Sequence, residues 1–424
     1  MSCILGKRPS LKLVLCPMLA AAIFCSCGRA SSAGSDGSMA QSASLTIDPS
    51  KELLINDLSV VEDPDRTVWQ QTADGDGAAW TFGHLVRDLA GEHDASDFVL
   101  QWLKTWESPQ LVNGHSVAAR PSIRSLVIDP WRQASGCGAG DSPCYLDFSR
   151  APFRLLAIVN RPDLRTFTPD AGGDAGQGRF VFGVLNPAGA KLQFTAIFEY
   201  SLIAQSADDV TAWAERWHSL GRHAFGDGYN QQLQNITEDF AGRNVAEDRP
   251  NGSALLQLRT NEVVLSPSTP LLWELREFNI SASTGLLRLV TVKQTPDVSL
   301  NNTETLADYI NGNADAIMSN LAVVPPQLLG GSAPNPGMPA PSALDFVWRS
   351  PGVAEGLRHQ FAINTCNGCH LSETATRFTH VKPRNAGVQA ALSDFLRLTA
   401  IPVRVDEMSA LLRGEHRDPE KHTD

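Results

Sequence analysis

The sequence predicts an α+β fold for most of the chain, followed by a small all-α segment. Over residues 51–329, strand-like apolar runs cluster together and helical patterns occur at intervals, which favours an α+β domain over a strictly alternating sheet. Residues 330–342 are rich in Pro and Gly and would interrupt any regular element. Over residues 343–424, apolar residues recur at helical spacing. The sequence therefore predicts two domains joined by a linker.

Helices in the large domain are predicted by apolar residues that recur every three or four positions. Phe98, Val99 and Trp102 follow a polar residue, Asp94 or Ser96, that is suited to capping the start of a helix. The same periodicity occurs in three further segments. The four predicted helices cover residues 98–106, 210–220, 229–240 and 306–321.

Strands are predicted where β-branched, aromatic and other apolar residues form short runs. Glu199 lies inside one of these runs, and its side chain would point either inward, as a functional carboxylate, or outward to solvent. Arg161 and Asp163 follow another run in Asn160–Arg165, where they would either line a cleft or form an ion pair within a surface loop. The predicted strands cover residues 153–159, 179–185, 192–202, 255–264 and 286–292.

The C-terminal segment contains three predicted helices. Ser350 and Pro351 are suited to the start of the first, and apolar residues then continue on one face toward Cys366. Apolar residues at i, i+3, i+4, i+7 and i+8 predict a second helix over residues 388–396. A third helix is predicted over residues 405–412.

The N-terminus has the features of an export signal. Lys7, Arg8 and Lys12 form a basic start, and the apolar run over residues 13–24 is short for a membrane span. The stretch ending at Cys27 resembles a bacterial lipoprotein cleavage site, which implies a lipidated Cys27 and a place in the cell envelope, at the outer membrane facing the periplasm or the cell surface. An ordinary secreted protein or an uncleaved anchor are the alternatives. The predicted division is a signal peptide over residues 1–26 and a Ser- and Gly-rich tether over residues 27–50.

Charge and motifs narrow the function further. The formal net charge of −11 argues against nucleic acid as a partner. The sequence contains no metalloprotease, nucleophile-elbow, phosphate-loop or dinucleotide-binding motif. Cys137 and Cys144 flank a Gly-rich loop, and in an oxidising compartment we expect them to form a disulfide.

The most specific feature of the chain is the run Cys366-Asn367-Gly368-Cys369-His370. Covalent haem attachment requires two thiols and an imidazole at this spacing, because the sulfurs bond to one edge of the porphyrin and the adjacent histidine ligates the iron. A Cys366–Cys369 disulfide or half of a zinc site are the alternatives. A zinc site would need further ligands, and Cys137 and Cys144 lie far away in the sequence.

This motif, with the helix that leads into it, resembles a monohaem c-type cytochrome domain. The resemblance covers residues 350–413 and implies a small all-α fold around one covalent haem c. It also implies that Cys366 and Cys369 are the attachment sites and that His370 is the proximal iron ligand.

The sixth iron ligand is open between two residues. His380 lies in a predicted loop, whereas Met408 lies within a predicted helix, where methionine is more often a core residue. An open sixth position is the third alternative. The basic residues Arg377, Lys382 and Arg384 would pair with the haem propionates, or be solvated.

The resemblance implies an exported, lipid-anchored haem protein that transfers electrons to or from a redox partner protein. An electron carrier is favoured over a catalytic enzyme. The first alternative is a haem-linked oxidoreductase with its substrate site in the large domain. The second is a non-haem envelope binding lipoprotein in which Cys366 and Cys369 form a disulfide.

Overall fold

The computed structural model describes residues 45–70, 78–138, 140, 142–168, 172–267, 272–325, 336–339 (backbone only) and 346–416. The predicted signal peptide, Cys27 and most of the tether and of the linker lie outside these residues. From Leu45 onward, the described residues form one compact unit. No helix in the described ranges is long and apolar enough to cross a membrane.

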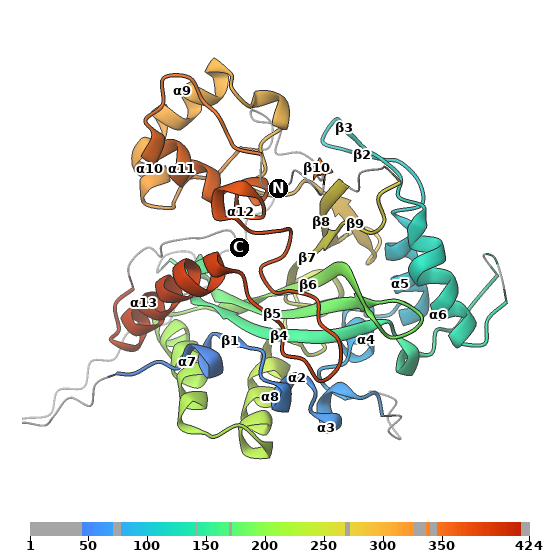
Figure 1. Cartoon of the computed structure of the whole chain (residues 1–424). Coiled ribbons are helices and arrows are strands. Elements are labelled where there is room, and N and C mark those ends of the chain that lie inside the picture. The colour runs from blue at the N-terminus through green and yellow to red at the C-terminus, as the bar shows by residue number, and fades with distance from the viewer. Residues whose placement is uncertain are drawn as a thin grey trace, which may run out of the picture. The chain divides into compact units, whose positions relative to one another are not determined.

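A large antiparallel sheet is the centre of this unit (Figure 1). Its strands are hydrogen-bonded in the order β1-β4-β5-β6-β7-β8-β10, and β9 also pairs with β8. The described part of the chain therefore combines helices with one large antiparallel sheet, as an α+β fold predicts. The strands are β1 (Leu54–Ile55), β4 (Phe153–Arg161), β5 (Gly173–Leu185), β6 (Lys191–Ala204), β7 (Leu255–Glu262), β8 (Leu272–Ile280), β9 (Leu287–Val290) and β10 (Pro336–Pro339).

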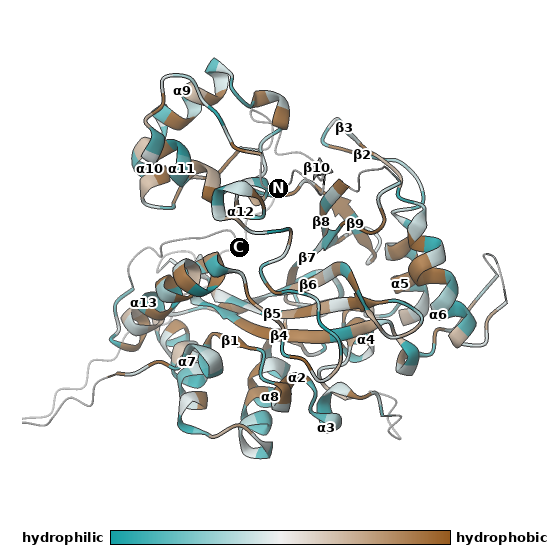
Figure 2. Cartoon of the chain, in the orientation of Figure 1, coloured by the Kyte–Doolittle hydropathy of each residue, from teal (hydrophilic) through white to brown (hydrophobic). Residues whose placement is uncertain are grey.

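One face of the sheet is covered by helices and forms the main core. Because side chains alternate along a strand, Phe180 and Phe182 of β5 and Phe198 and Tyr200 of β6 all belong to this core. Figure 2 shows β4 and β5 as predominantly hydrophobic, whereas α7 and α8 carry residues of both kinds, as expected for helices that cover a sheet. The helices that contribute buried residues to this core include α4 (Phe82–Ala90), α5 (Ala95–Lys104), α6 (Asp129–Ala134), α7 (Ala207–Ser219) and α8 (Asp227–Ala241).

The predicted strands and helices of the large domain all occur, with shifted ends, and the segment 306–321 divides into α9 (Glu304–Gly312) and α10 (Ala314–Met318). The sequence did not predict β8. Three charged residues of this strand, Glu274, Arg276 and Glu277, are almost completely buried and interrupt the hydrophobic pattern that marks a strand. The remaining short elements are α1 (Pro49–Glu52), α2 (Leu58–Val61), α3 (Pro64–Thr67) and the hairpin of β2 (Gln110–Val112) and β3 (His115–Val117).

The predicted helix over residues 388–396 is wrong in its first half. Leu392 forms an isolated β-bridge with Val381, and Val388 is 57% exposed. Helical structure begins only after Ser393, whose hydroxyl accepts a hydrogen bond from the backbone N–H of Leu396, as an N-cap residue does. From there a π-helical turn, Leu396–Ala400, leads into α13 (Ile401–Leu412).

The C-terminal segment packs on the sheet instead of forming a separate body. The Asn56 amide donates to the backbone oxygen of Ala390 at 2.8 Å, and Arg384, which is 2% exposed, donates to the backbone oxygen of Leu155 at 2.8 Å. Glu62 also pairs with Arg384. The segment over 343–424 that the sequence predicts as a haem domain thus belongs, in its described part, to the same compact unit as the sheet.

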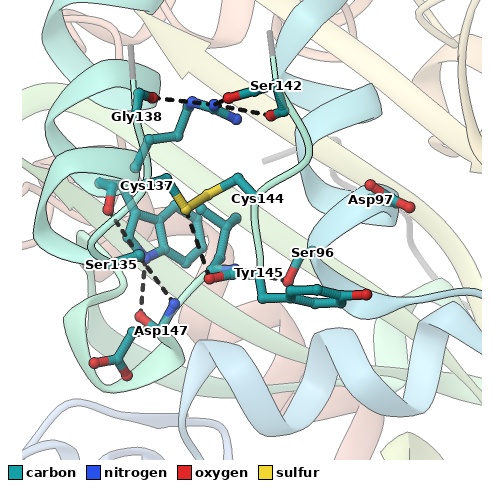
Figure 3. Close-up of a disulfide and its surroundings, with 12 residues drawn as sticks. Ser96, Asp97, Ser135, Cys137, Gly138, Ser142, Cys144, Tyr145 and Asp147 are labelled. Atoms are coloured by element: carbon teal, nitrogen blue, oxygen red, sulfur yellow. Dashed lines mark hydrogen bonds between the residues drawn. A yellow bond between two sulfur atoms is a disulfide. The ribbon is translucent and has the colours of Figure 1, made fainter. Parts of the chain in front are cut away.

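Cys137 and Cys144 form the disulfide that the sequence predicts, in the loop after α6 (Figure 3). Arg132 also holds this loop, because its guanidinium donates to the backbone oxygen of Ser142 at 3.0 Å. Across the loop, the hydroxyl of Ser96 accepts a hydrogen bond from the Leu146 backbone N–H at 2.8 Å. The disulfide therefore pins a loop against α5, away from the motif.

Candidate functional site

The motif cysteines lie on a short helix, α12 (Cys366–Cys369), that follows α11 (Glu355–Ile363). Thr365 caps it by accepting a hydrogen bond from the Gly368 backbone N–H at 3.1 Å. The indole N–H of Trp348 is 2.9 Å from the Thr365 hydroxyl and 3.0 Å from the side-chain oxygen of Asn367. A Cβ at Gly368 would lie 2.1 Å from the backbone oxygen of Ala362, so glycine is required here by a close backbone approach.

Both motif thiols are buried and reduced. Cys366 is 3% exposed and Cys369 is fully buried, and neither belongs to a disulfide. Burial raises the pKa of the Cys366 thiol, although the nearby Arg259 acts in the opposite direction. The sulfur of Cys369 lies 3.3 Å from Nε2 of His380. The first thiol therefore lies beside an arginine and the second beside a histidine.

His370 is oriented through its Nδ1 atom, which lies 2.6 Å from the backbone oxygen of Phe378. Because a carbonyl only accepts, Nδ1 carries the proton and donates it. Trp273 of β8 stacks on the imidazole, with ring centroids 5.6 Å apart. A histidine that ligates a metal is commonly oriented in this way, by a hydrogen bond from one ring nitrogen to a backbone carbonyl.

His380 lies beside His370, with ring centroids 4.6 Å apart. Its Nδ1 is 2.7 Å from the hydroxyl of Ser393, so this ring is also oriented by a partner at Nδ1. Met408, the other candidate for the sixth ligand, is a residue of α13 and is completely buried in the main core. The structure thus brings His380, and not Met408, to the motif.

Cys366, His370 and His380 all line one cavity of about 60 Å³. This volume is well below the roughly 300–1,000 Å³ typical of ligand and cofactor sites, so a ligand of that size would require the walls of the cavity to separate. One wall is the face of the sheet that the helices leave uncovered, and the other is the C-terminal segment. The apolar part of the lining consists of Leu54, Val159, Val181, Ile197, Leu275, Val381 and Leu396.

The polar part of the cavity lining is strongly cationic. Four arginines line it, Arg161, Arg179, Arg259 and Arg404, against one carboxylate, Glu199. Burial opposes ionisation of Glu199, but the neighbouring guanidinium groups, Arg179 foremost, outweigh it and lower the pKa of this carboxyl. With Glu199 ionised, the lining carries an excess of positive charge that suits an anionic ligand.

Carboxylates just outside the cavity hold these arginines in place. Asp163 lies 2.6 Å from Nη2 of Arg161 and 3.7 Å from Nε of Arg404, so one buried carboxylate orients two arginines. Glu277 accepts a hydrogen bond from Nε of Arg259 at 3.1 Å. The ion pair expected within Asn160–Arg165 is present, and it also lines the cavity through Arg161.

Besides Oε1 of Glu199, three buried oxygens of the cavity lining make no hydrogen bond in the described structure. They are Oγ1 of Thr195, Oδ1 of Asn261 and Oγ1 of Thr379. A buried polar atom without a partner is rare in proteins, and a bound water or ion is one of its common causes. The cavity therefore has the charge and the unsatisfied polar atoms of a ligand site.

Several cavity residues follow from the sequence and others do not. Glu199 and Arg161 were candidates, and both line the cavity. Arg384, a candidate for pairing with haem propionates, instead binds Glu62 and backbone oxygens outside the cavity. Arg259 and Arg404 were missed because a single arginine within a strand or helix carries no local signal of the cavity it faces.

Comparisons with protein-family models, with curated proteins and with solved structures find no match for this chain. Among the described residues, no group of three or more His, Cys, Asp or Glu side chains is placed to hold a metal ion. Haem iron needs only one or two protein ligands, because the porphyrin supplies the other four.

Proposed function

We propose that this chain is a c-type haem protein that transfers electrons. Cys366 and Cys369 would bond covalently to one haem, and His370 would be its proximal ligand. The observation that carries this proposal is that a thiol of the motif and two oriented imidazoles meet in one buried cavity. The small cytochrome-like fold that the sequence predicts would then be completed by the sheet, which supplies the opposite wall.

The arginines of the cavity suit the two haem propionates. In haem the propionates lie on the porphyrin edge opposite the thioether bonds, so their partners belong at the far end of the cavity from Cys366. Arg259, on β7, is an electrostatic neighbour of Cys366. Arg161 is on β4, three strand spacings or about 14 Å across the sheet. We therefore assign the propionates to Arg161 and Arg404, which share Asp163.

His380 is the proposed sixth ligand, in preference to Met408. When haem is bound, its iron supplies one-electron redox chemistry. If His370 and His380 both held the iron, the potential would be lower than with a histidine and a methionine. An iron held by two protein ligands suits electron transfer better than catalysis, which favours the carrier over the oxidoreductase.

We further propose that the protein is exported and anchored to the envelope through Cys27. The disulfide between Cys137 and Cys144 supports an oxidising compartment, because such bonds rarely persist in the cytoplasm. A redox partner protein and an outer-membrane location belong to the same proposal. The competing function, a binding lipoprotein without haem, would require Cys366 and Cys369 to form a disulfide.

The deciding experiment is expression of the chain without residues 1–26 in a periplasm equipped for cytochrome maturation. We expect the intact mass to include one haem and the reduced spectrum to show the α-band of a c-type haem. The variant with Cys366→Ser and Cys369→Ser should lose the covalent haem, whereas Cys137→Ser with Cys144→Ser should keep it. An apoprotein in which Cys366 and Cys369 are disulfide-linked would contradict the proposal.

A further inference from the structure

A second cavity adjoins the cavity lined by Cys366, His370 and His380, which we call the haem cavity, and shares Arg179 and Arg259 with it. We call this second cavity the vestibule. Its volume is about 320 Å³. Its lining comes from strands β5 and β7, from Leu164 and Thr166 after β4, and from the segments around Lys293, Ala322 and Asn364. The vestibule therefore borders the first cavity at Arg179 and Arg259.

The vestibule is cationic, although the protein as a whole is acidic. Lys293 joins Arg179 and Arg259 in its lining, against a single carboxylate, Asp174. That carboxylate is already engaged, because Ser201 donates to it and Arg249 lies 3.4 Å from it. A cationic recess in a protein of net charge −11 concentrates small anions from solution.

Two carboxylates behind the lining neutralise this charge only in part. Glu199 lies 3.3 Å from Arg179 and 3.6 Å from Arg259, and Glu277 lies 3.1 Å from Arg259 and 3.6 Å from Lys293. Because Asp174 is balanced by Arg249, three cations face two remaining carboxylates, which leaves an excess of one positive charge. The recess suits a ligand with one negative charge.

Donors for such an anion are available at the same place. Within the described structure, Arg259 donates one hydrogen bond, from Nε to Glu277, and its Nη1 lies 3.6 Å from Glu199, so the N–H groups of Nη2 are the donors for a ligand. The ammonium of Lys293 donates to the Gln257 side chain at 2.9 Å and has two further N–H groups. A planar guanidinium matches the two oxygens of a carboxylate.

An apolar patch lies in the same recess. Leu256, Leu321, Ala322 and Val323 are part of its lining, and Val323 is 72% exposed. Aliphatic side chains beside a cationic group suit a ligand with a short hydrocarbon body and one charged end. A hydrated inorganic anion would gain nothing from this patch.

We propose that the vestibule binds a small aliphatic carboxylate, with its charged end on Arg259 and Lys293 and its hydrocarbon on Leu321 to Val323. This inference goes beyond the proposed function and does not depend on it, because every residue that it uses belongs to the protein alone. A bound carboxylate would lie beside the haem cavity, since Arg259 lines both.

The test is isothermal titration calorimetry on the full mature chain with sodium butyrate, and with butyramide as the uncharged ligand of the same shape. We expect saturable binding of butyrate and none of butyramide. Because exposed ion pairs contribute up to about 1 kcal/mol, Lys293→Gln should weaken butyrate binding about fivefold. Lys191→Gln, which removes an exposed lysine outside the vestibule, should leave it unchanged.

Two results would overturn the inference. One is no saturable heat with butyrate, and the other is equal binding of butyrate and butyramide. Equal butyrate affinities of the Lys293→Gln and Lys191→Gln variants would show that the carboxylate does not bind at Lys293. Since the titration can be made on protein with or without haem, its failure is distinguishable from failure of haem attachment.

Discussion

His370 is held more firmly than a surface histidine would be. The Phe378 backbone oxygen fixes its Nδ1, and Trp273 stacks on the ring from β8. The indole N–H of Trp273 is buried and makes no hydrogen bond in the described structure. The stacking therefore depends on the shape of the pocket, and Trp273 acts on the proposed iron ligand only through its position.

The first prediction concerns the sixth iron ligand. His380→Ala should convert a six-coordinate haem with two histidines into one that binds added imidazole or carbon monoxide readily, because the cavity then offers one protein ligand. Met408→Leu should leave the visible spectrum unchanged, since Met408 belongs to the main core. Absorption spectra of both oxidised and reduced variants decide this.

The control is the free energy of unfolding of the Met408→Leu variant. A leucine at position 408 nearly conserves the side-chain volume, and such exchanges usually cost less than about 1.5 kcal/mol of unfolding free energy. Loss of the near-infrared band typical of methionine ligation in Met408→Leu, with an unchanged spectrum in His380→Ala, would reverse the assignment.

Strand β8 shows why part of the fold could not be predicted from the sequence. On the face covered by helices, Arg120 pairs with Glu262 of β7 and with Glu274, and Arg276 lies 2.5 Å from Glu274. A strand that buries paired charges has no alternation of polar and apolar residues to detect. The predicted strands β4 to β7, by contrast, contain the aromatic and β-branched runs of an ordinary core.

The cavity was predictable only where polar residues stood out locally. Glu199 interrupts an apolar run, and Arg161 lies in a polar cluster at the end of a strand, so both were candidates. His380 was a candidate because it follows the motif closely. Arg404 meets Arg161 through Asp163 only after α13 packs on the sheet, and no local pattern encodes such a long-range contact.

The second prediction concerns the pH dependence of this buried charge network. Burial raises the pKa of Glu262 to about 7, against the opposing effect of Arg120. The folded protein therefore binds this proton more tightly than the unfolded chain. The resulting stabilisation is fully present below about pH 4.5 and is lost as the pH rises through 7.

Urea unfolding at pH 5 and pH 8 tests this. Between these values the wild type should lose up to about 3 kcal/mol relative to Glu262→Gln, whose amide does not titrate. Glu215→Gln, at an exposed position of α7, should follow the wild type. Parallel curves for the wild type and Glu262→Gln would show that Glu262 has an ordinary pKa.

On the scale of the whole molecule, the structure does not separate the predicted haem domain from the sheet domain. The linker over 330–342 suggests two domains, yet the C-terminal segment contributes only one wall of its own cavity. The other wall is the sheet, and Arg384 and Asn56 connect the two. A domain boundary inferred from a Pro- and Gly-rich segment therefore need not separate two folding units.

The third prediction follows for the isolated C-terminal segment. A fragment of residues 343–424 should not fold alone, because its Val381, Phe395 and Leu396 pack in a cluster with Leu54 and Val181 of the sheet. Circular dichroism of the fragment, with and without haem attachment, should show no cooperative thermal transition. A cooperative transition in the fragment would restore the independent haem domain.

The burial of the two motif thiols also has a consequence for the order of events in the cell. Cys366 is 3% exposed and Cys369 is fully buried beneath the loop that carries His380. An enzyme that joins haem to these sulfurs cannot reach them once the sheet and the C-terminal segment have closed around them. Under the proposed function, attachment must precede final folding, and a chain that folds first would be permanently excluded from maturation.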